Sequence, residues 1–219
     1  MTNDKIAVIG GTGNLGAAIA TGLAKAGYPI IVGSRDAARA EAAAAEMSAA
    51  GDVTGTDNTG AAEKGDIVIL AVPFAHQEAT LGAIRTALEG KLVVETTVPL
   101  VPPKVARVQL PPEGSAAVRA QALLGDSVTV TSAFHTVSAH ALTDGTVSGD
   151  VLVFGDKRAA RDRVVELVDA LGLRGVHGGG LANSAAAEAM TSVLIFVNRL
   201  YGAGGAGLAI TGDVGAPKD

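Results

Sequence analysis

Near its start the chain reads Lys5-Ile6-Ala7-Val8-Ile9-Gly10-Gly11-Thr12-Gly13-Asn14-Leu15-Gly16. The apolar residues 6–9 predict a buried strand, and the small-residue run 17–26 predicts a helix behind it. Between them the glycines follow the spacing G-x-G-x-x-G. In such a turn Gly11 allows a sharp bend, Gly13 lets a phosphate approach the backbone, and Gly16 lets the helix pack against its strand.

A strand, a glycine turn and a helix in this order predict a site for the pyrophosphate of a dinucleotide. The unpaired N–H groups at the start of the helix would face the anion. We expect the contacts to come from the turn, at Gly11, Thr12, Gly13, Asn14, Leu15 and Gly16. A turn that binds nothing is the disfavoured alternative, because the strand and the helix that the motif requires are both present.

The end of the second predicted strand, residues 28–32, indicates which dinucleotide is bound. An NAD enzyme usually carries an acidic residue there, whereas this chain has Ser34 and Arg35. Ser34 can hydrogen-bond a 2′-phosphate, Arg35 can grip it with its planar guanidinium, and Arg39 is a second cation one helical turn later. Asp36 suits a helix cap. The pattern favours NADP(H), with solvated helix arginines as the alternative.

Composition limits the classes of protein that this chain can be. Its 219 residues are 48% hydrophobic, enough for a substantial core in one compact unit or two unequal lobes. A net charge of −5 and 3% aromatic residues argue against a nucleic-acid partner. Cysteine is absent, and the histidines show no metal-ligand spacing, so we expect no metal site.

The chain also lacks the patterns of export and of membrane insertion. Residues 1–5 run directly into the first strand without the apolar stretch of a secretory signal, so we expect a cytoplasmic protein. The apolar runs 67–72 and 192–197 are far shorter than the roughly 20 residues of a membrane span. They are predicted to be core segments, and no membrane partner is expected.

Strand and helix patterns alternate along the chain, which predicts an α/β fold with a Rossmann-like, doubly wound parallel sheet. Residues 51–58 are predicted to form a polar connection, and the proline-rich residues 98–112 an irregular excursion. We expect a dinucleotide-binding domain over 1–127. A smaller C-terminal α/β lobe over 128–219 is expected to complete the cofactor cleft.

In an open parallel sheet, ligands bind beyond the carboxyl ends of the strands. The fourth strand ends at Val72-Pro73-Phe74, where backbone groups can touch a nicotinamide ribose. A later strand ends at His135 and Thr136, and His135 is our candidate catalytic residue, hydrogen-bonding a ring carbonyl. A structural histidine that caps local backbone is the alternative. No G-x-S-x-G elbow supports seryl hydrolysis, whereas hydride transfer needs little beyond proximity.

The chain resembles the NADPH-dependent coenzyme F420 reductase family over nearly its whole length. The blocks that carry the resemblance are Gly10 to Gly16, Gly33-Ser34-Arg35, Gly114-Ser115-Ala116-Ala117, Ser132-Ala133-Phe134-His135-Thr136, Asn183-Ser184 with Thr191, and Gly207 to Gly212. The resemblance implies hydride exchange between C5 of a deazaflavin, coenzyme F420, and the nicotinamide C4 of NADP. It also implies that Pro73 and Phe74 lie on the nicotinamide side and that His135 and Thr191 line the deazaflavin pocket.

The chain departs from this family at three positions. Ala185 and Ala209 stand where the resemblance leads us to expect arginine, and Ala189 stands where a serine occurs. Two alternatives therefore stay open: an NADPH-dependent reductase that uses a flavin or a small carbonyl compound, and an NADPH-binding module without catalysis. The helix predicted over 184–200 has one apolar face, suited to the core or to a homodimer interface, and we expect a homodimer.

Overall fold

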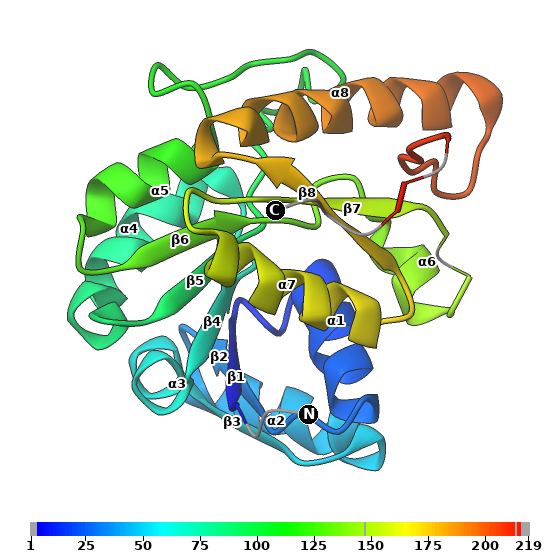
Figure 1. Ribbon diagram of the computed structural model, residues 1–219. Helices are drawn as coiled ribbons and strands as arrows, with labels where there is room; N and C mark the ends of the chain where they lie inside the picture. The colour runs from blue at the N-terminus through cyan, green and yellow to red at the C-terminus, as the bar shows by residue number, and fades with distance from the viewer. Residues whose placement is uncertain (1–3, 147, 213, 216–219) are drawn as a thin grey trace.

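The computed structural model of the protein describes residues 4–146, 148–212 and 214–215. Within these ranges one eight-stranded sheet forms the centre of the molecule, in the spatial order β3-β2-β1-β4-β5-β6-β7-β8 (Figure 1). The strands are β1 Ile6–Ile9, β2 Ile30–Ser34, β3 Val53–Asp57, β4 Ile67–Leu70, β5 Leu92–Glu95, β6 Thr129–Ser132, β7 Asp150–Phe154 and β8 Arg174–Gly179. The α-helices are α1 Asn14–Lys25, α2 Ala37–Met47, α3 Asn58–Lys64, α4 Phe74–Ile84, α5 Ala116–Leu124, α6 Ala139–Thr143, α7 Arg158–Ala170 and α8 Ser184–Tyr201, and the short 3-10 helices are η1 Ser48–Ala50, η2 Arg85–Leu88 and η3 Leu181–Asn183.

Helices cover both faces of the sheet, because the side chains of each strand alternate between the faces. On one face, Ile6 and Val8 of β1 belong to a core cluster with α1, α2 and α7. On the other, Ala7 and Ile9 belong to a cluster with α3, α4 and α5. The strands β1, β2 and β4 are therefore buried along their whole length, as parallel strands of a doubly wound fold are.

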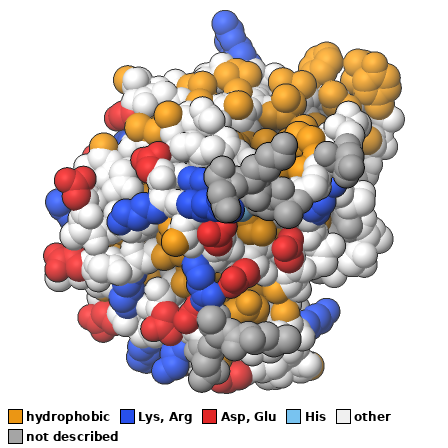
Figure 2. Space-filling view, viewed as in Figure 1, with side chains coloured by type: hydrophobic (Ala, Val, Ile, Leu, Met, Phe, Trp, Pro, Cys, Tyr) orange, Lys and Arg blue, Asp and Glu red, His pale blue; other side chains and the backbone are white. Residues whose placement is uncertain are grey.

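The last helix, α8, lies outside these two layers and packs against α5 and β7 (Figure 1). Its buried side chains are Ser184, Ala187, Glu188 and Ser192. Large hydrophobic side chains on the rest of the helix are exposed, and apolar atoms gather over this part of the surface (Figure 2). The apolar face predicted from the sequence is thus only partly covered within the described chain.

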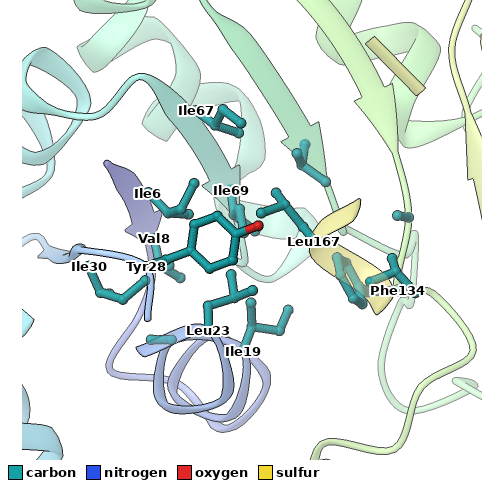
Figure 3. Packing of buried hydrophobic residues seen from close by; sticks show 14 of the residues in the cluster. Ile6, Val8, Ile19, Leu23, Tyr28, Ile30, Ile67, Ile69, Phe134 and Leu167 are labelled. Carbon is teal, nitrogen blue, oxygen red and sulfur yellow. The ribbon is translucent and has the colours of Figure 1, made fainter. Parts of the chain in front are cut away.

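The larger core cluster is built around the first strands and the helix α1. Tyr28, which precedes β2, places its ring among Ile6, Val8 and Leu23 (Figure 3). These three aliphatic side chains are completely buried. Each such side chain stabilises the fold by about 1.5–3 kcal/mol relative to exposure, so this cluster fixes the position of the glycine turn that follows β1.

One strand runs against the rest of the sheet. The strands from β3 to β6 pair in parallel, whereas β7 is antiparallel to β6, with Ser132 opposite Phe154. The strand β8 is again parallel to β7. Because β5 pairs with β6, the sheet continues across residue 128, and the division into domains 1–127 and 128–219 stays a prediction.

Two elements differ from the expectation. The polar connection predicted over residues 51–58 is wrong, because Val53–Asp57 forms β3 at the edge of the sheet. An edge strand pairs on one side only, so its side chains stay partly exposed and its sequence lacks an apolar run. Its Gly55 packs so closely on α2 that a Cβ there would lie 2.2 Å from the Ala40 carbonyl oxygen.

The short helix α6 was also not predicted. Residues 98–112 hold no helix or strand, as expected.

Candidate functional site

A cleft of about 230 Å³ opens at the carboxyl ends of β1, β2 and β4. Its position coincides with the reversal of strand order, because β2 and β4 flank β1. Ligands of open parallel sheets bind at such a point. The lining residues are Gly10, Thr12, Gly13, Ser34, Arg35, Asp36, Arg39, Asn58, Ala71, Val72, Pro73, His76 and Thr80. We name this the first cleft.

The glycine turn forms one wall of the first cleft, and its sharp bend lies one residue earlier than predicted. Gly10, not Gly11, has the positive φ of 80°. A Cβ on Gly10 would lie 2.5 Å from the Ala71 carbonyl oxygen, and a Cβ on Gly16 would lie 2.5 Å from the Gly10 oxygen. Gly13 caps α1 without a side chain, so the first N–H groups of this helix remain available to a phosphate.

The ribose end of the first cleft carries two guanidinium groups and one carboxylate. Arg35 and Arg39 are exposed and line the cleft together with the buried Ser34. Asp36 caps α2 by accepting a hydrogen bond of 3.0 Å from the Ala38 amide. Its carboxylate is thereby engaged with its own helix, which leaves the two arginines to attract an anion.

Six lining residues were not among the predicted contacts, and three of them, Asn58, His76 and Thr80, add polar side chains from α3 and α4. Asn58 begins α3, directly after β3, and its Oδ1 is buried with no hydrogen-bond partner in the part of the chain that the structure describes. Such an acceptor is satisfied by a donor from a ligand or water. His76 and Thr80 follow Pro73 at helical spacing along α4. The strand-end rule would have found Asn58 had β3 been predicted.

A second cleft of about 180 Å³ lies beyond β6 and beside α8. Its lining residues are His135, Thr136, Val137, Ser138, Thr191, Leu194, Ile195, Asn198 and Ala206. The chain enters it through Phe134, which is buried and has a left-handed φ of 67° that is rare for a bulky residue. Thr191 of α8 donates a hydrogen bond of 2.8 Å to the His135 carbonyl and so joins the two walls.

The His135 side chain is held as a neutral imidazole. Its Nε2 lies 2.7 Å from Ser132 Oγ, and the residue is 5% exposed. Burial lowers the pKa of His135 to about 3, so the ring carries no charge near neutral pH. An uncharged imidazole can position a polar ring atom by hydrogen bonding, but it does not deliver a proton as a cation would.

Comparison with known proteins agrees with this geometry. A family model described as "NADP oxidoreductase coenzyme F420-dependent" matches residues 5–99. The F420-dependent NADP reductase of Methanothermobacter marburgensis is 40% identical over 94% of this chain and 98% of its own length. The chain belongs to the F420-dependent NADP reductase family. The relative of the same name from Methanocaldococcus jannaschii is 38% identical over the same shares of the two chains.

The family membership and the fold predicted from the sequence are both confirmed. A solved structure from Arthrobacter sp. FB24 is 26% identical and has a TM-score of 0.81, covering 95% of this chain and 99% of that one. The glycine turn and β4, which form the first cleft, fall inside the part that the family model matches. The second cleft lies outside it.

The contact residues predicted from the sequence of this member of the F420-dependent NADP reductase family fall into three groups. The first cleft collects Thr12, Gly13, Ser34, Arg35, Arg39, Val72 and Pro73. The second cleft collects His135, Thr136 and Thr191. The residues that line neither cleft are Gly11, Asn14, Leu15, Gly16 and Phe74. Phe74 instead packs under the Arg119 guanidinium, 5.3 Å from its ring centroid. Ala185, Ala189 and Ala209, the departures from the family pattern, also lie outside both linings.

A buried polar cluster between the two clefts was not predicted. Gln77 of α4 donates to Glu95 at the end of β5 (3.0 Å), and Glu95 accepts from the Thr97 amide (2.7 Å). Glu188 of α8 accepts from the Ala116 and Ala117 amides, which begin α5. Burial raises the pKa of both Glu95 and Glu188 to about 7. We name Gln77, Glu95, Ser115, Ser184 and Glu188 the polar cluster.

The described residues contain no group of three or more histidine, aspartate or glutamate side chains placed to hold a metal ion. Over the same residues, no helix combines the length and the apolar character that crossing a bilayer requires.

Replacing Arg35 tests which cofactor the first cleft selects. If its guanidinium meets a 2′-phosphate, Arg35→Ala weakens NADPH binding by about tenfold to a hundredfold, since a charge-assisted hydrogen bond contributes roughly 1.5–3 kcal/mol. NADH binding, measured by the same calorimetric titration, changes little. Arg85→Ala removes the same charge from η2, outside the cleft, and serves as the control. Equal losses for the two nucleotides would contradict the assignment.

The buried carboxyl of Glu95 makes stability depend on pH. Its pKa rises from 4.5 to about 7 on folding, so between these values the native state holds a proton that the unfolded chain has released. Stability therefore falls as pH rises from about 4.5 to 7, by roughly 3 kcal/mol for this group. Glu95→Gln should flatten the dependence in urea unfolding at pH 5, 6, 7 and 8. Glu46→Gln, on the exposed side of α2, is the control and should leave the slope unchanged; an unchanged slope for Glu95→Gln would contradict the prediction.

Proposed function

We propose that this chain transfers hydride between NADP(H) and the deazaflavin coenzyme F420. The observation that carries the proposal is the pairing of a dinucleotide cleft with a second cleft at the same edge of the sheet, in a chain that belongs to this reductase family. Pro73 ends β4 and His135 follows β6, two strands away. At about 4.8 Å per strand these ends are roughly 10 Å apart, so a ring lying past Pro73 can meet a ring in the second cleft.

The residues of the first cleft fit the phosphates and the adenosine of NADP(H). The N–H groups of the turn and of α1 face the pyrophosphate, and Ser34 with Arg35 and Arg39 bind the 2′-phosphate. The buried Oδ1 of Asn58 lacks a partner within the described residues and accepts a hydrogen bond from the bound nucleotide. Val72 and Pro73 then direct the nicotinamide toward β6. When bound, the nicotinamide would exchange hydride with the deazaflavin.

The residues of the second cleft bind and orient a planar ring. His135 hydrogen-bonds a polar ring atom as a neutral imidazole, and Thr136 and Thr191 complete the polar side of the cleft. Leu194 and Ile195 of α8 supply the apolar side and exclude water. Holding two rings at reacting distance in such a site removes much of the barrier without a dedicated acid or base.

Turnover decides between this function and its rivals. We expect NADPH to bleach the visible absorbance of F420 in the presence of the protein, and His135→Asn to slow the reaction with little effect on NADPH binding. If the protein reduces a flavin or a small carbonyl compound but not F420, that compound and not F420 is its hydride acceptor. NADPH binding without reduction of any of these would leave a binding module and refute the proposal.

We also propose that the protein is a homodimer that pairs through α8. Its exposed hydrophobic side chains are Met190, Val193, Phe196, Leu200 and Tyr201, of which Phe196 is 54% and Tyr201 75% exposed (Figure 2). Met190, Val193, Phe196 and Leu200 recur every three to four residues, with Tyr201 beside Leu200, and an exposed apolar stripe of this kind marks an interaction site. A cytoplasmic location and the lack of a nucleic-acid partner stay predictions from the sequence.

The dimer can be tested by changing this stripe. Replacing Phe196 and Leu200 by serine removes two large exposed apolar side chains of the stripe and should halve the mass measured by sedimentation equilibrium. As a control, replacing Val101 and Val108 by serine removes exposed apolar side chains of the irregular segment and should leave the mass unchanged. A wild-type protein that sediments as a monomer would refute the proposal.

A further inference from the structure

The last part of the described chain is fastened to the sheet edge. Residues 205–210, here named the strap, follow α8 and carry no helix or strand. The Ala206 amide donates to Asn198 Oδ1 at 2.8 Å, and the Asp150 amide donates to the Leu208 carbonyl at 2.7 Å. The strap therefore lies along the start of β7 and beside the end of α8.

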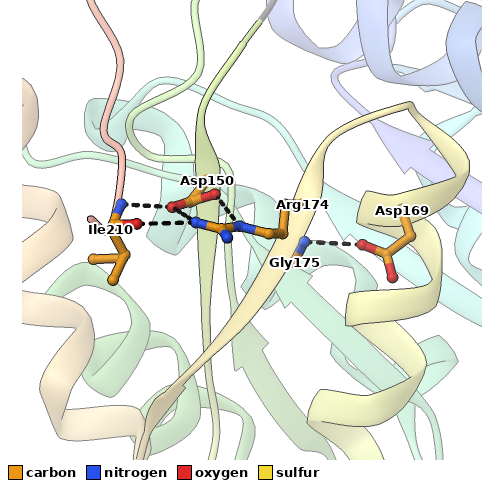
Figure 4. Close-up of polar contacts among 5 residues, drawn as sticks. All are labelled: Asp150, Asp169, Arg174, Gly175 and Ile210. Atoms are coloured by element: carbon orange, nitrogen blue, oxygen red, sulfur yellow. Dashed lines mark hydrogen bonds and ion pairs between the residues drawn. The ribbon is translucent and has the colours of Figure 1, made fainter. Parts of the chain in front are cut away.

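An ion pair secures the far end of the strap. Arg174 of β8 forms a bidentate ion pair with Asp150 of β7, and both N–O distances are 2.6 Å (Figure 4). The same guanidinium donates to the Ile210 carbonyl at 3.0 Å, and the Ile210 amide donates to Asp150 Oδ2 at 2.5 Å. Two side chains thus satisfy both backbone groups of one strap residue.

The carboxylate of Asp150 is buried, and its negative charge strengthens the contact with Arg174. The Asp150 side chain is 4% exposed, whereas that of Arg174 is 48% exposed. Hydrogen bonds from Arg174 hold the pKa of Asp150 below its usual range, and the Ile210 amide lowers it further. Asp150 is therefore ionised at neutral pH, and the planar guanidinium matches it in a way that lysine cannot.

The strap forms a wall of the second cleft. Ala206 lines this cleft together with His135 and Thr191. The approach is close on both sides of that residue, since a Cβ on Gly205 would lie 3.0 Å from Ser138 Oγ and one on Gly207 3.3 Å from the Ser148 oxygen. Small residues let the strap lie directly on the segment that follows His135.

We propose that Asp150 and Arg174 are positioning residues for the second substrate, which fasten the strap so that Ala206 closes the cleft against α8. The inference rests on the proposed function, because it assigns the second cleft to the deazaflavin. Neither side chain lines that cleft, so both act through the strap. A loosened strap widens the site of the acceptor and leaves unaltered the first cleft, which lies at the carboxyl ends of β1, β2 and β4.

The experiment separates the two substrates. Arg174→Gln should raise the KM for F420 by about fivefold to a hundredfold, the range that a displaced wall of a site costs. The Kd for NADPH should stay within about twofold, as expected for sites that share no partners. Hydrogen exchange of the strap amides, followed by mass spectrometry, should accelerate. Arg174→Lys, which keeps the charge but not the fork, should lie between the two proteins in both measurements.

Arg163→Gln is the matched control. Arg163 forms an ion pair with Glu166 of α7 and one with Asp4, away from the strap, so its loss tests the effect of removing an arginine pair as such. Equal increases in the KM values for both substrates, or strap exchange unchanged in Arg174→Gln, would overturn the inference. If Arg174→Gln does not fold, Arg174→Lys carries the test. Wild-type protein that fails to reduce F420 would instead refute the proposed function, while strap exchange in the variants would still report whether the pair fastens the strap.

Discussion

The first cleft depends on backbone contacts so close that no side chain fits between them. Gly10 lies under the Ala71 carbonyl, and Gly16 lies against Gly10, so a Cβ at either position would collide with a carbonyl oxygen. These contacts bring the end of β1, the start of α1 and the end of β4 to one point. A phosphate at the helix N-terminus and a ring beyond Pro73 consequently share one cleft. The position of the cofactor therefore depends on the two glycines that permit these contacts.

The polar cluster extends this positioning to the second cleft. Glu188 accepts the first amides of α5, which fixes α8 relative to the sheet, and one turn later Thr191 donates to the His135 carbonyl. Burying two carboxyl groups is unfavourable in itself. Hydrogen bonds from backbone amides offset part of this cost, and the raised pKa values show that part of it remains. The buried carboxyl groups thus help to hold α8 beside His135, and they lower the free energy of unfolding at high pH.

The sequence revealed those features whose signal is local. The apolar strands, the glycine spacing and the basic residues after β2 each depend on neighbours within a few positions, and they predicted the fold and seven of the thirteen residues that line the first cleft. The edge strand β3 escaped because its half-exposed side chains resemble a loop, and Asn58 was missed with it. Gly10 and Gly11 could not be told apart, since both are glycine. The polar cluster joins Gln77 to Glu188 across the fold, and charged residues in a sequence give no indication that they are buried.

The lining of the second cleft gives a physical reason why positioning matters more than charge there. Among the described residues that line it there is no lysine, arginine, aspartate or glutamate, and burial keeps His135 neutral. Arg174, which donates a hydrogen bond to the strap, is engaged with the buried carboxylate of Asp150. A site of this kind distinguishes ligands by the shape of its walls and by a few hydrogen bonds, because no long-range attraction compensates for a poor fit. Ala185 and Ala209, which stand where arginine was expected, are compatible with such a site, because ring recognition is left to His135, Thr191 and the strap.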